Sequence, residues 1–206
     1  LLSLSASASS GTPAQAAVPS ANIGQSITLH GSGLLASDRV VFTTMDDSGN
    51  LSTSTVTPTT VDLANQTITV VVPTYATTGA VRLERDDTGL LLQIVPTLGD
   101  VTMTNPGGAF VGSNLRLSGS GFAEGSTAVL LGTSRIDDVS RNQGLNVYSG
   151  TTIDLSVPAG APTGPISVST TGGTSAPFSI TLSSISSSAT GTPASASSAS
   201  ANAGQV

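Results

Sequence analysis

Few side chains in this sequence could carry out acid–base or nucleophilic chemistry. His30 is the single histidine, and the chain has neither cysteine nor lysine. A Ser-His-Asp arrangement would have to use His30 as its base, together with a positioned nucleophile and a group that orients the ring. His30 instead precedes Gly31 in an alternating stretch, so we expect an outward-facing strand residue and no enzyme activity. Cysteine catalysis, thiolate metal sites, disulfides and lysine isopeptide bonds are excluded within these residues.

Three pairs of adjacent aspartates are the other candidates for chemistry, at 46–47, 86–87 and 137–138. The first pair lies in Asp46-Asp47-Ser48-Gly49-Asn50, and clustered oxygens of this kind suit calcium. The segment lacks the alternating ligands and the closing Glu of a helix-loop-helix calcium site, and Asp or Asn beside Gly also forms tight turns. Two interpretations stay open: a turn, or a weak calcium site at Asp46, Asp47 and Asn50 shared between loops of adjacent domains. We expect no other cofactor.

Sugar processing or stacking has little support in the sequence. Paired carboxylates for glycoside hydrolysis would need a cleft and usually aromatic platforms. The chain has no Trp and only Tyr75 and Tyr148, and three of its four Phe occupy core-facing strand positions, namely Phe42, Phe122 and Phe178.

The composition excludes further classes of partner. Only 9% of the residues are charged, with six arginines, twelve acidic residues and a net charge of -6. Nucleic acid is not expected, because phosphate neutralisation needs clustered Lys or Arg. No apolar stretch approaches the ~20 residues that a membrane span requires. Arg82, Glu84 and Arg85 could form a cross-strand charge cluster, or simply a solvated strand face.

The elements that hold these residues recur along the chain. Gly11-Thr12-Pro13-Ala14 recurs at 191–194, and Ser20-Ala21-Asn22 with Gly24-Gln25 recurs at 200–202 with 204–205, an offset of 180 residues. A fixed offset is the signature of an array. The sequence therefore covers one period of 180 residues and an overlap of about 25 with the next.

A more diverged repeat lies inside this period. The block Gly-x-x-Ile-x-Leu-x-Gly-Ser-Gly-Leu at 24–34 matches Gly-x-x-Leu-x-Leu-x-Gly-Ser-Gly-Phe at 112–122. The alternating strands before Pro73 and after Gly79 match those around Pro158 and Gly164. We therefore expect two homologous domains, at 11–97 and 98–184, flanked by the end of a preceding repeat at 1–10 and a Ser/Ala-rich connector that begins the next repeat at 185–206.

Alternation of apolar and polar residues predicts strands with one face on a core. Proline stops a strand, and glycine permits tight bends, so the positions that we expect to define the fold are Gly31, Gly33, Pro73, Gly79, Gly119, Gly121, Pro158 and Gly164. The clearest predicted hairpin joins 81–85 to 90–95 through Asp86-Asp87-Thr88-Gly89. Its counterpart joins 166–170 to 176–182 through Thr171-Gly172-Gly173-Thr174. No segment has a helical period of useful length, so the prediction is all-β: two tandem immunoglobulin-like β-sandwiches.

The two repeated blocks resemble the TIG (IPT) domains, which are immunoglobulin-like domains of plexins, some transcription factors, polysaccharide-active bacterial enzymes and bacterial surface proteins. The resemblance covers Pro13–Pro96 and Gly99–Ser183, and it implies TIG-type sandwiches. The opening strand of the first unit departs from the family, since Pro13-Ala14-Gln15-Ala16-Ala17 is nearly free of large side chains. The matching residues determine a fold and say little about activity.

Ser/Ala-rich residues fill 3–20 and 184–200. Such tracts form flexible linkers or glycosylated stalks, but small side chains also allow close packing, and we consider that the tract adds a strand to the edge of a neighbouring repeat. Residues 1–8 could likewise be the tail of a signal peptide, although the repeat favours the last strand of a preceding unit.

The sequence favours a structural function. We expect a repeat unit of an extracellular filament or a long cell-surface protein, a scaffold or spacer whose partners are neighbouring repeats or copies of itself. Two alternatives stay open: an adhesin that binds a glycan or host protein, and an accessory domain of a polysaccharide-active enzyme.

Overall fold

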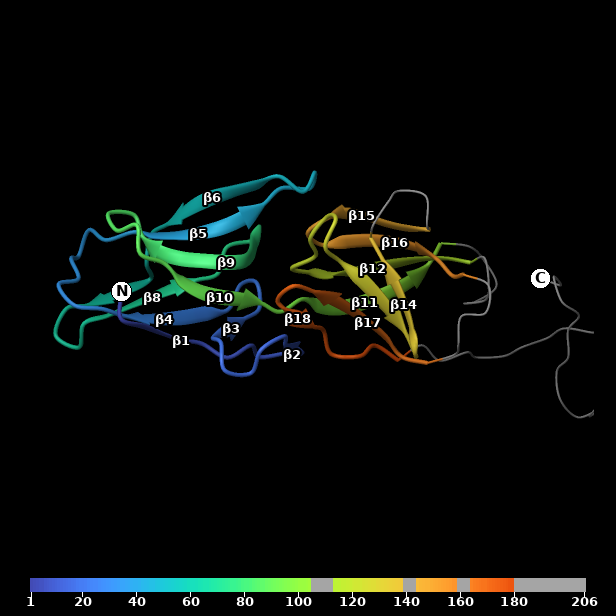
Figure 1. Ribbon diagram of the computed structural model, residues 1–206, viewed down its shortest axis with the longest axis horizontal. Coiled ribbons are helices and arrows are strands. Elements are labelled where there is room, and N and C mark those ends of the chain that lie inside the picture. The colour runs from blue at the N-terminus through green and yellow to red at the C-terminus, as the bar shows by residue number, and fades with distance from the viewer. Residues whose placement is uncertain (105–112, 139–143, 159–163, 180–206) are drawn as a thin grey trace, which may run out of the picture.

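The computed structural model describes residues 1–104, 113–138, 144–158 and 164–179. These residues form strands in four sheets and no helix, so the fold is all-β and sandwich-like. None of them forms a helix that is long and apolar enough to cross a membrane. The strands gather into two halves that lie end to end along the long axis of the molecule (Figure 1).

The first half contains two sheets. One has the strand order β1 (Ser3–Ser5), β4 (Ser26–His30), β8 (Thr67–Val71) and β7 (Thr60–Asp62). The other has the order β3 (Ser20–Ala21), β10 (Leu90–Ile94), β9 (Ala76–Leu83), β5 (Val40–Met45) and β6 (Leu51–Val56). Both sheets contribute to one hydrophobic core, in which β8 buries Ile68 and Val70 and leaves the intervening threonines half-buried. The burial of β8 therefore follows the expected period of two residues.

The second half repeats this arrangement around its own core. One sheet has the order β11 (Thr97–Met103), β12 (Asn114–Ser120), β16 (Thr152–Ser156) and β15 (Leu145–Ser149). The other has the order β14 (Ser134–Asp137), β13 (Ala128–Leu131), β17 (Ile166–Thr170), β18 (Gly173–Thr174) and β2 (Thr12–Pro13). The strand β2 comes from the beginning of the chain, so one sheet of the second half contains a piece of the first.

The predicted Gly-Ser-Gly bends occur in both halves. Gly33 and Gly121 have φ of 65° and 74°, a left-handed conformation that favours glycine. Gly119 lies so close to the neighbouring strand that a Cβ would collide with the carbonyl oxygen of Thr97. Gly31 is also crowded, because a Cβ there would come 2.7 Å from Cδ2 of Leu34.

The prolines and later glycines agree with the prediction except at one position. Pro73 follows the end of β8 and Pro158 follows the end of β16, and Gly164 precedes β17. The strand expected after Gly79 begins before it, because Gly79 lies within β9. It lies at an irregularity in the pairing with β5, where Phe42 faces Val81 and Thr44 faces Ala76. A Cβ at this position would come 2.6 Å from Cβ of Thr43, so glycine allows the two strands to approach.

The first predicted hairpin is confirmed, because β9 and β10 pair antiparallel with Leu90 opposite Val81. The second is tighter than predicted: Thr170 pairs with Gly173, so only Thr171 and Gly172 form the turn and β18 begins inside the segment expected to be the loop. Two glycines in succession make this short connection possible. The end of the expected strand, residues 180–182, lies outside the described residues.

Residues 1–10, which the sequence suggested to be the end of a preceding repeat, pack against the first half. The strand β1 pairs antiparallel with β4, with Leu4 opposite Leu29. Leu4 is only 8% exposed and belongs to the first core. Burial of this side chain is favourable by roughly 1.5–3 kcal/mol, which explains why the segment packs here.

Candidate functional site

The residues considered for calcium form a turn between β5 and β6. Oδ1 of Asp46 accepts hydrogen bonds from the backbone N of Ser48 and of Asn50, each 2.9 Å long, and Oδ2 accepts one of 3.0 Å from Nδ2 of Asn50. The hydrogen bond from the Asn50 side chain is the main reason why the pKa of Asp46 lies below its ordinary value. Asp46 thus uses its carboxylate oxygens to close the turn.

Asp47 points in a different direction, toward the second half. Its Oδ1 accepts a hydrogen bond of 3.2 Å from the backbone N of Gly150, which follows β15. Gly49 lies beside Glu124 of the second half, since a Cβ on Gly49 would come 3.4 Å from Cγ of Glu124. Among the described residues, no three His, Cys, Asp or Glu side chains gather as a metal site would require. The turn therefore joins the two halves by direct contact.

We expect calcium to have no effect on stability through this turn. Asp46→Asn should lower the melting temperature by a few degrees. Both carboxylate oxygens of Asp46 accept hydrogen bonds, and in Asn one of them is replaced by an NH2 group, which would face another donor. Millimolar calcium should change the melting temperature of neither the wild type nor this variant, as measured by differential scanning calorimetry. A calcium-dependent rise in the wild type that is absent from Asp46→Asn would instead establish the metal site.

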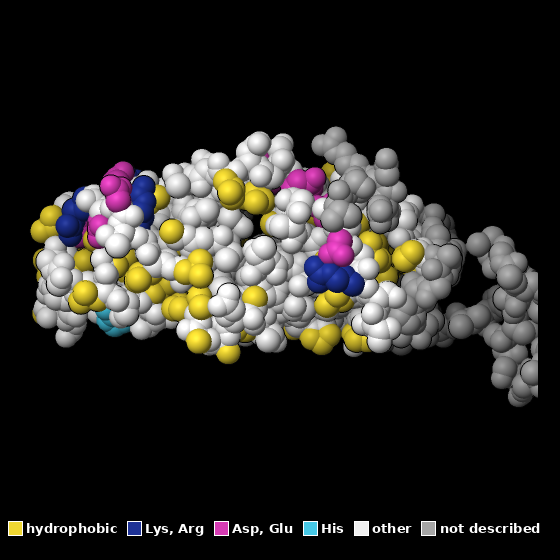
Figure 2. Space-filling model, viewed as in Figure 1, with side chains coloured by type: hydrophobic (Ala, Val, Ile, Leu, Met, Phe, Trp, Pro, Cys, Tyr) yellow, Lys and Arg dark blue, Asp and Glu magenta, His cyan; other side chains and the backbone are white. Residues whose placement is uncertain are grey.

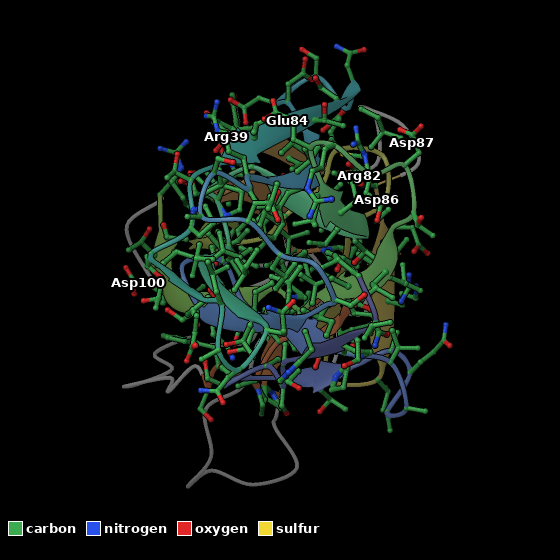
Figure 3. The ribbon with its side chains drawn as sticks, turned by 90° about the vertical axis from the view of Figure 1, so that its left-hand side faces the viewer. Arg39, Arg82, Glu84, Asp86, Asp87 and Asp100 are labelled. Carbon is green, nitrogen blue, oxygen red and sulfur yellow. The ribbon has the colours of Figure 1, made fainter. Side chains whose placement is uncertain are left out.

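Charged side chains gather at the end of the first half that faces away from the second. Figure 2 shows a surface made mostly of uncharged groups, with basic and acidic side chains together at this end. In the end-on view of Figure 3, Arg39, Arg82, Glu84, Asp86 and Asp87 lie on the same side of the molecule. The predicted cluster of Arg82, Glu84 and Arg85 is thus part of a larger group of charges.

Asp38 is the buried member of this group and was not predicted. Its side chain is 2% exposed and accepts hydrogen bonds from Nε and Nη2 of Arg85, at 2.6 and 2.9 Å. It also accepts one of 2.8 Å from the backbone N of Leu35. The Arg85 guanidinium, which is 46% exposed, holds the pKa of Asp38 below its ordinary value of 3.8. This pair fixes the bend after Gly33, whose carbonyl also accepts a hydrogen bond from Arg85.

Asp38→Asn should lower the free energy of unfolding by about 1–3 kcal/mol at pH 7, because it removes a charged acceptor from a buried site. The folded-state pKa of Asp38 is depressed, so its contribution is complete well above pH 3.8 and is lost as the pH falls below 3.8 through the folded-state value. The difference between wild type and Asp38→Asn should therefore shrink in acid, as measured by urea denaturation at several pH values. A difference that stays constant down to pH 2 would contradict this explanation.

His30 lies on β4 at a half-buried position. Its Nε2 is 3.0 Å from Oγ of Ser5 on β1, so the side chain links the first two strands of the sheet. The contacts of the ring thus connect β4 to its neighbouring strand β1.

The contact between the two halves, which we call the junction, involves the connection between them and the N-terminal segment. Only Val95 and Pro96 separate β10 from β11, and both are buried. The N-terminal segment (residues 1–25) runs along the first half and inserts β2 beside β18, pairing Thr12 with Thr174 and Pro13 with Gly173. The backbone N of Ala14 donates a hydrogen bond of 3.1 Å to the carbonyl of Gly172.

Three glycines allow the backbones to approach at the junction. Gly11 has φ of 82°, and a Cβ there would come 2.5 Å from the carbonyl oxygen of Thr174 and 2.8 Å from Cγ1 of Val95. A Cβ on Gly172 would collide with the carbonyl oxygen of Ile94 and with Oγ1 of Thr78 in the first half. A Cβ on Gly173 would collide with the carbonyl oxygen of Thr12. The junction therefore depends on positions that have no side chain.

Two buried amides hold the N-terminal segment on the first half. The Gln93 side chain, 2% exposed, accepts a hydrogen bond of 2.8 Å from N of Gln15 and donates to the carbonyls of Gln15 and Val18 at 2.8 and 3.0 Å. Asn22, 4% exposed, donates from Nδ2 to the carbonyls of Ser10 and Val95, at 3.0 and 2.9 Å. Its Oδ1 accepts a hydrogen bond of 2.9 Å from N of Ser10. These amides satisfy backbone groups of a segment that has few large side chains.

Two shallow grooves lie on the outer surface, each lined by an exposed tyrosine. One contains Tyr75 beside Asp46 and Asp47. The other contains Tyr148 beside Arg116 and Asp154, which form a bidentate ion pair with distances of 2.7 and 2.8 Å. The tyrosines come from different elements, because Tyr75 precedes β9 and Tyr148 lies on β15. The two halves therefore present different outer surfaces.

Comparison with known proteins adds no assignment. No protein family model and no curated protein matches this chain. The candidate site consequently rests on the geometry of the junction.

The repeat in the sequence indicated some of the residues at the junction but not others. Asn22 and Gln25 recur as Asn202 and Gln205, but Gln93 and Asp38 belong to no repeated block. A single buried polar side chain has no spacing pattern, so its role becomes visible only when its backbone partners are placed around it.

Proposed function

We propose that this chain is a structural repeat unit of an extracellular filament or a long cell-surface protein, without enzyme activity. In this proposal each half is one immunoglobulin-like sandwich of TIG type, and the pair forms one period of an array. The observation that carries the proposal is β2: a segment held on the first half completes a sheet of the second. Sharing a strand between neighbours transmits load through backbone hydrogen bonds, as a scaffold requires.

Three further features support a scaffold. The connection between the halves is two buried residues long, so the halves are held at a short, fixed separation. The strand order of the first two sheets recurs in the second half, as stacked repeats require. The surface carries scattered apolar side chains and few charges (Figure 2). A surface without a large apolar patch is expected of a protein that contacts neighbouring units mainly through its two ends.

Immunoelectron microscopy of the cells that produce this chain tests the proposal. Antibodies against the full chain should label the cell surface or extracellular fibres at regular intervals along their length. Label confined to the cell interior would overturn the proposal. Labelling with pre-immune serum is the matched control.

The groove at Tyr148 supports a second candidate, a surface protein that binds a glycan. An exposed tyrosine, 58% accessible, beside an arginine–aspartate pair offers a stacking face and polar groups for hydroxyls. Screening the full chain against a glycan array would detect such a ligand, and binding should be lost in Tyr148→Ala and kept in Tyr75→Ala. Equal binding by both variants would remove this candidate.

A further inference from the structure

The chain carries a second copy of the segment that forms the junction. Residues 181–205, which we call the C-terminal copy, align with the N-terminal segment at the offset of 180. The positions that are identical include those with a special role in the first segment: Gly11, Thr12, Pro13, Ala14, Ser20, Asn22, Gly24 and Gln25 recur as Gly191, Thr192, Pro193, Ala194, Ser200, Asn202, Gly204 and Gln205.

These identical residues make most of the contacts of the N-terminal segment that depend on residue type. Two such contacts are changed in the copy: Ser9, whose Oγ donates to Oδ1 of Asn22, becomes Ala189, and Ile23, which packs against the first core, becomes Ala203. Gly11 fits only because it lacks a Cβ, and Asn22 makes its bonds to Ser10 and Val95 from a buried position. Oγ of Ser20 accepts a hydrogen bond of 3.1 Å from N of Ala8. Oε1 of Gln25 accepts from N of Ser9 and N of Asn22, at 3.2 and 3.0 Å. Each of these requirements is met again in the C-terminal copy.

The positions that differ are mostly ones where the contact uses only the backbone. Gln93 binds the backbone of Gln15 and of Val18, which become Ser195 and Ser198 in the copy. The carbonyl of Pro19 accepts a hydrogen bond of 2.9 Å from N of Gln93, and position 199 is Ala. Leu4, which is buried, becomes Ser184, so the strongest likeness lies in 191–205. A surface that recognises backbone groups accepts these changes.

We propose that residues 191–205 dock at the junction of a second copy of this chain, along β10 of its first half and against β18 of its second half, where residues 11–25 lie in the chain's own fold. The partner is thus another copy of the same chain, and the surface is the one that Gln93, Val95 and Gly172 provide. This inference rests on the proposed function, because it names the segment and the surface through which successive units make contact.

The resulting contact is head-to-tail. The N-terminus lies at one end of the molecule, and residues 175–178 run from β18 back along β17 toward the opposite end, where Phe178 pairs with Ile166 (Figure 1). Joining the tail of one molecule to the first half of the next uses two different surfaces, and such heterologous contacts form open chains when the rotation does not close. In the wild type the N-terminal segment competes for this surface from within the same molecule at a high effective concentration, so docking between copies should increase when that segment is weakened.

A pair of matched double variants of the full chain tests the proposal. Gly11→Val with Asn22→Ala weakens docking of the N-terminal segment and leaves the C-terminal copy intact. Sedimentation velocity should then show oligomers whose weight-average sedimentation coefficient rises with protein concentration. Gly191→Val with Asn202→Ala should remain monomeric. The combination of all four substitutions should also remain monomeric, because neither segment can then dock.

The outcomes separate the two proposals. A folded Gly11→Val/Asn22→Ala chain that stays monomeric overturns the docking. Association of the chain that carries all four substitutions also overturns it. Should this variant fail to fold, a synthetic peptide of residues 181–206 should restore its melting transition, and a peptide with Asn202→Ala should not; no restoration also overturns the docking. The labelling of cells by antibody does not depend on this docking. If the docking fails but the cell surface or extracellular fibres are labelled, the proposed function stands; if the label is confined to the cell interior, the proposed function fails.

Discussion

Gln93→Ala should lower the free energy of unfolding by roughly 2–4 kcal/mol, which makes it one of the most damaging single changes at the junction. The substitution removes the partner of three backbone groups, on Gln15 and Val18, and leaves a buried space behind β10. An unsatisfied buried backbone group costs about 1–3 kcal/mol, and some of these groups regain water when the segment loosens. Urea denaturation measures the loss, and hydrogen exchange at the amide of Gln15 should accelerate at least tenfold.

Gln15→Ala is the matched control for this prediction. The side chain of Gln15 is exposed, and its bonds to Gln93 come from its backbone alone. An exposed substitution of this kind should change the free energy of unfolding by less than about 0.5 kcal/mol. Equal losses in Gln93→Ala and Gln15→Ala would show that the buried amide does not hold the segment.

Gly172→Ala should separate the two halves without disturbing their cores. The new Cβ would collide with the carbonyl oxygen of Ile94 and with Oγ1 of Thr78, so β18 must move away from the first half. The move strains or breaks the pairing of β18 with β2 and the hydrogen bond from N of Ala14 to the carbonyl of Gly172. We expect a loss of roughly 1–3 kcal/mol, as for overpacking in a close contact.

Hydrogen exchange distinguishes this local effect from general destabilisation. In Gly172→Ala the amide of Ala14 should exchange much faster, while the amides that pair β12 with β16 should keep their protection. Gly99→Ala is the matched control, because a Cβ on Gly99 would lie 3.7 Å from its nearest neighbour, an ordinary contact. Unchanged protection at Ala14 in a folded Gly172→Ala chain would contradict the role given to this glycine.

The two predictions concern residues on opposite sides of the junction. Gln93 belongs to the first half and holds the N-terminal segment by its backbone, whereas Gly172 belongs to the second half and leaves room for the first. If both are correct, the junction is a single cooperative unit, and loosening either side should weaken the other. The double variant should then lose less stability than the sum of the single losses.

The sequence by itself determined the class of fold and most of its turning points. Alternation of apolar and polar residues identified the buried faces of β8 and β16, because a strand turns every second side chain inward. Glycine and proline marked the bends at Gly33, Gly121 and Pro73, because their backbone restrictions are local and act wherever the residue occurs. The same local rules placed the hairpin between β9 and β10.

Only the tertiary structure decided which strands become neighbours and which polar side chains are buried. Thr12 and Pro13 carry no pattern that sends them to β18, about 160 residues away, since β2 is held by backbone pairing and by the absence of side chains at Gly11 and Gly173. Asp38, Asn22 and Gln93 look in the sequence like ordinary surface residues. Each is buried because a distant partner satisfies its hydrogen bonds: Arg85 for Asp38, the carbonyl of Val95 for Asn22, and the backbone of the N-terminal segment for Gln93. A contact between distant residues depends on the whole fold.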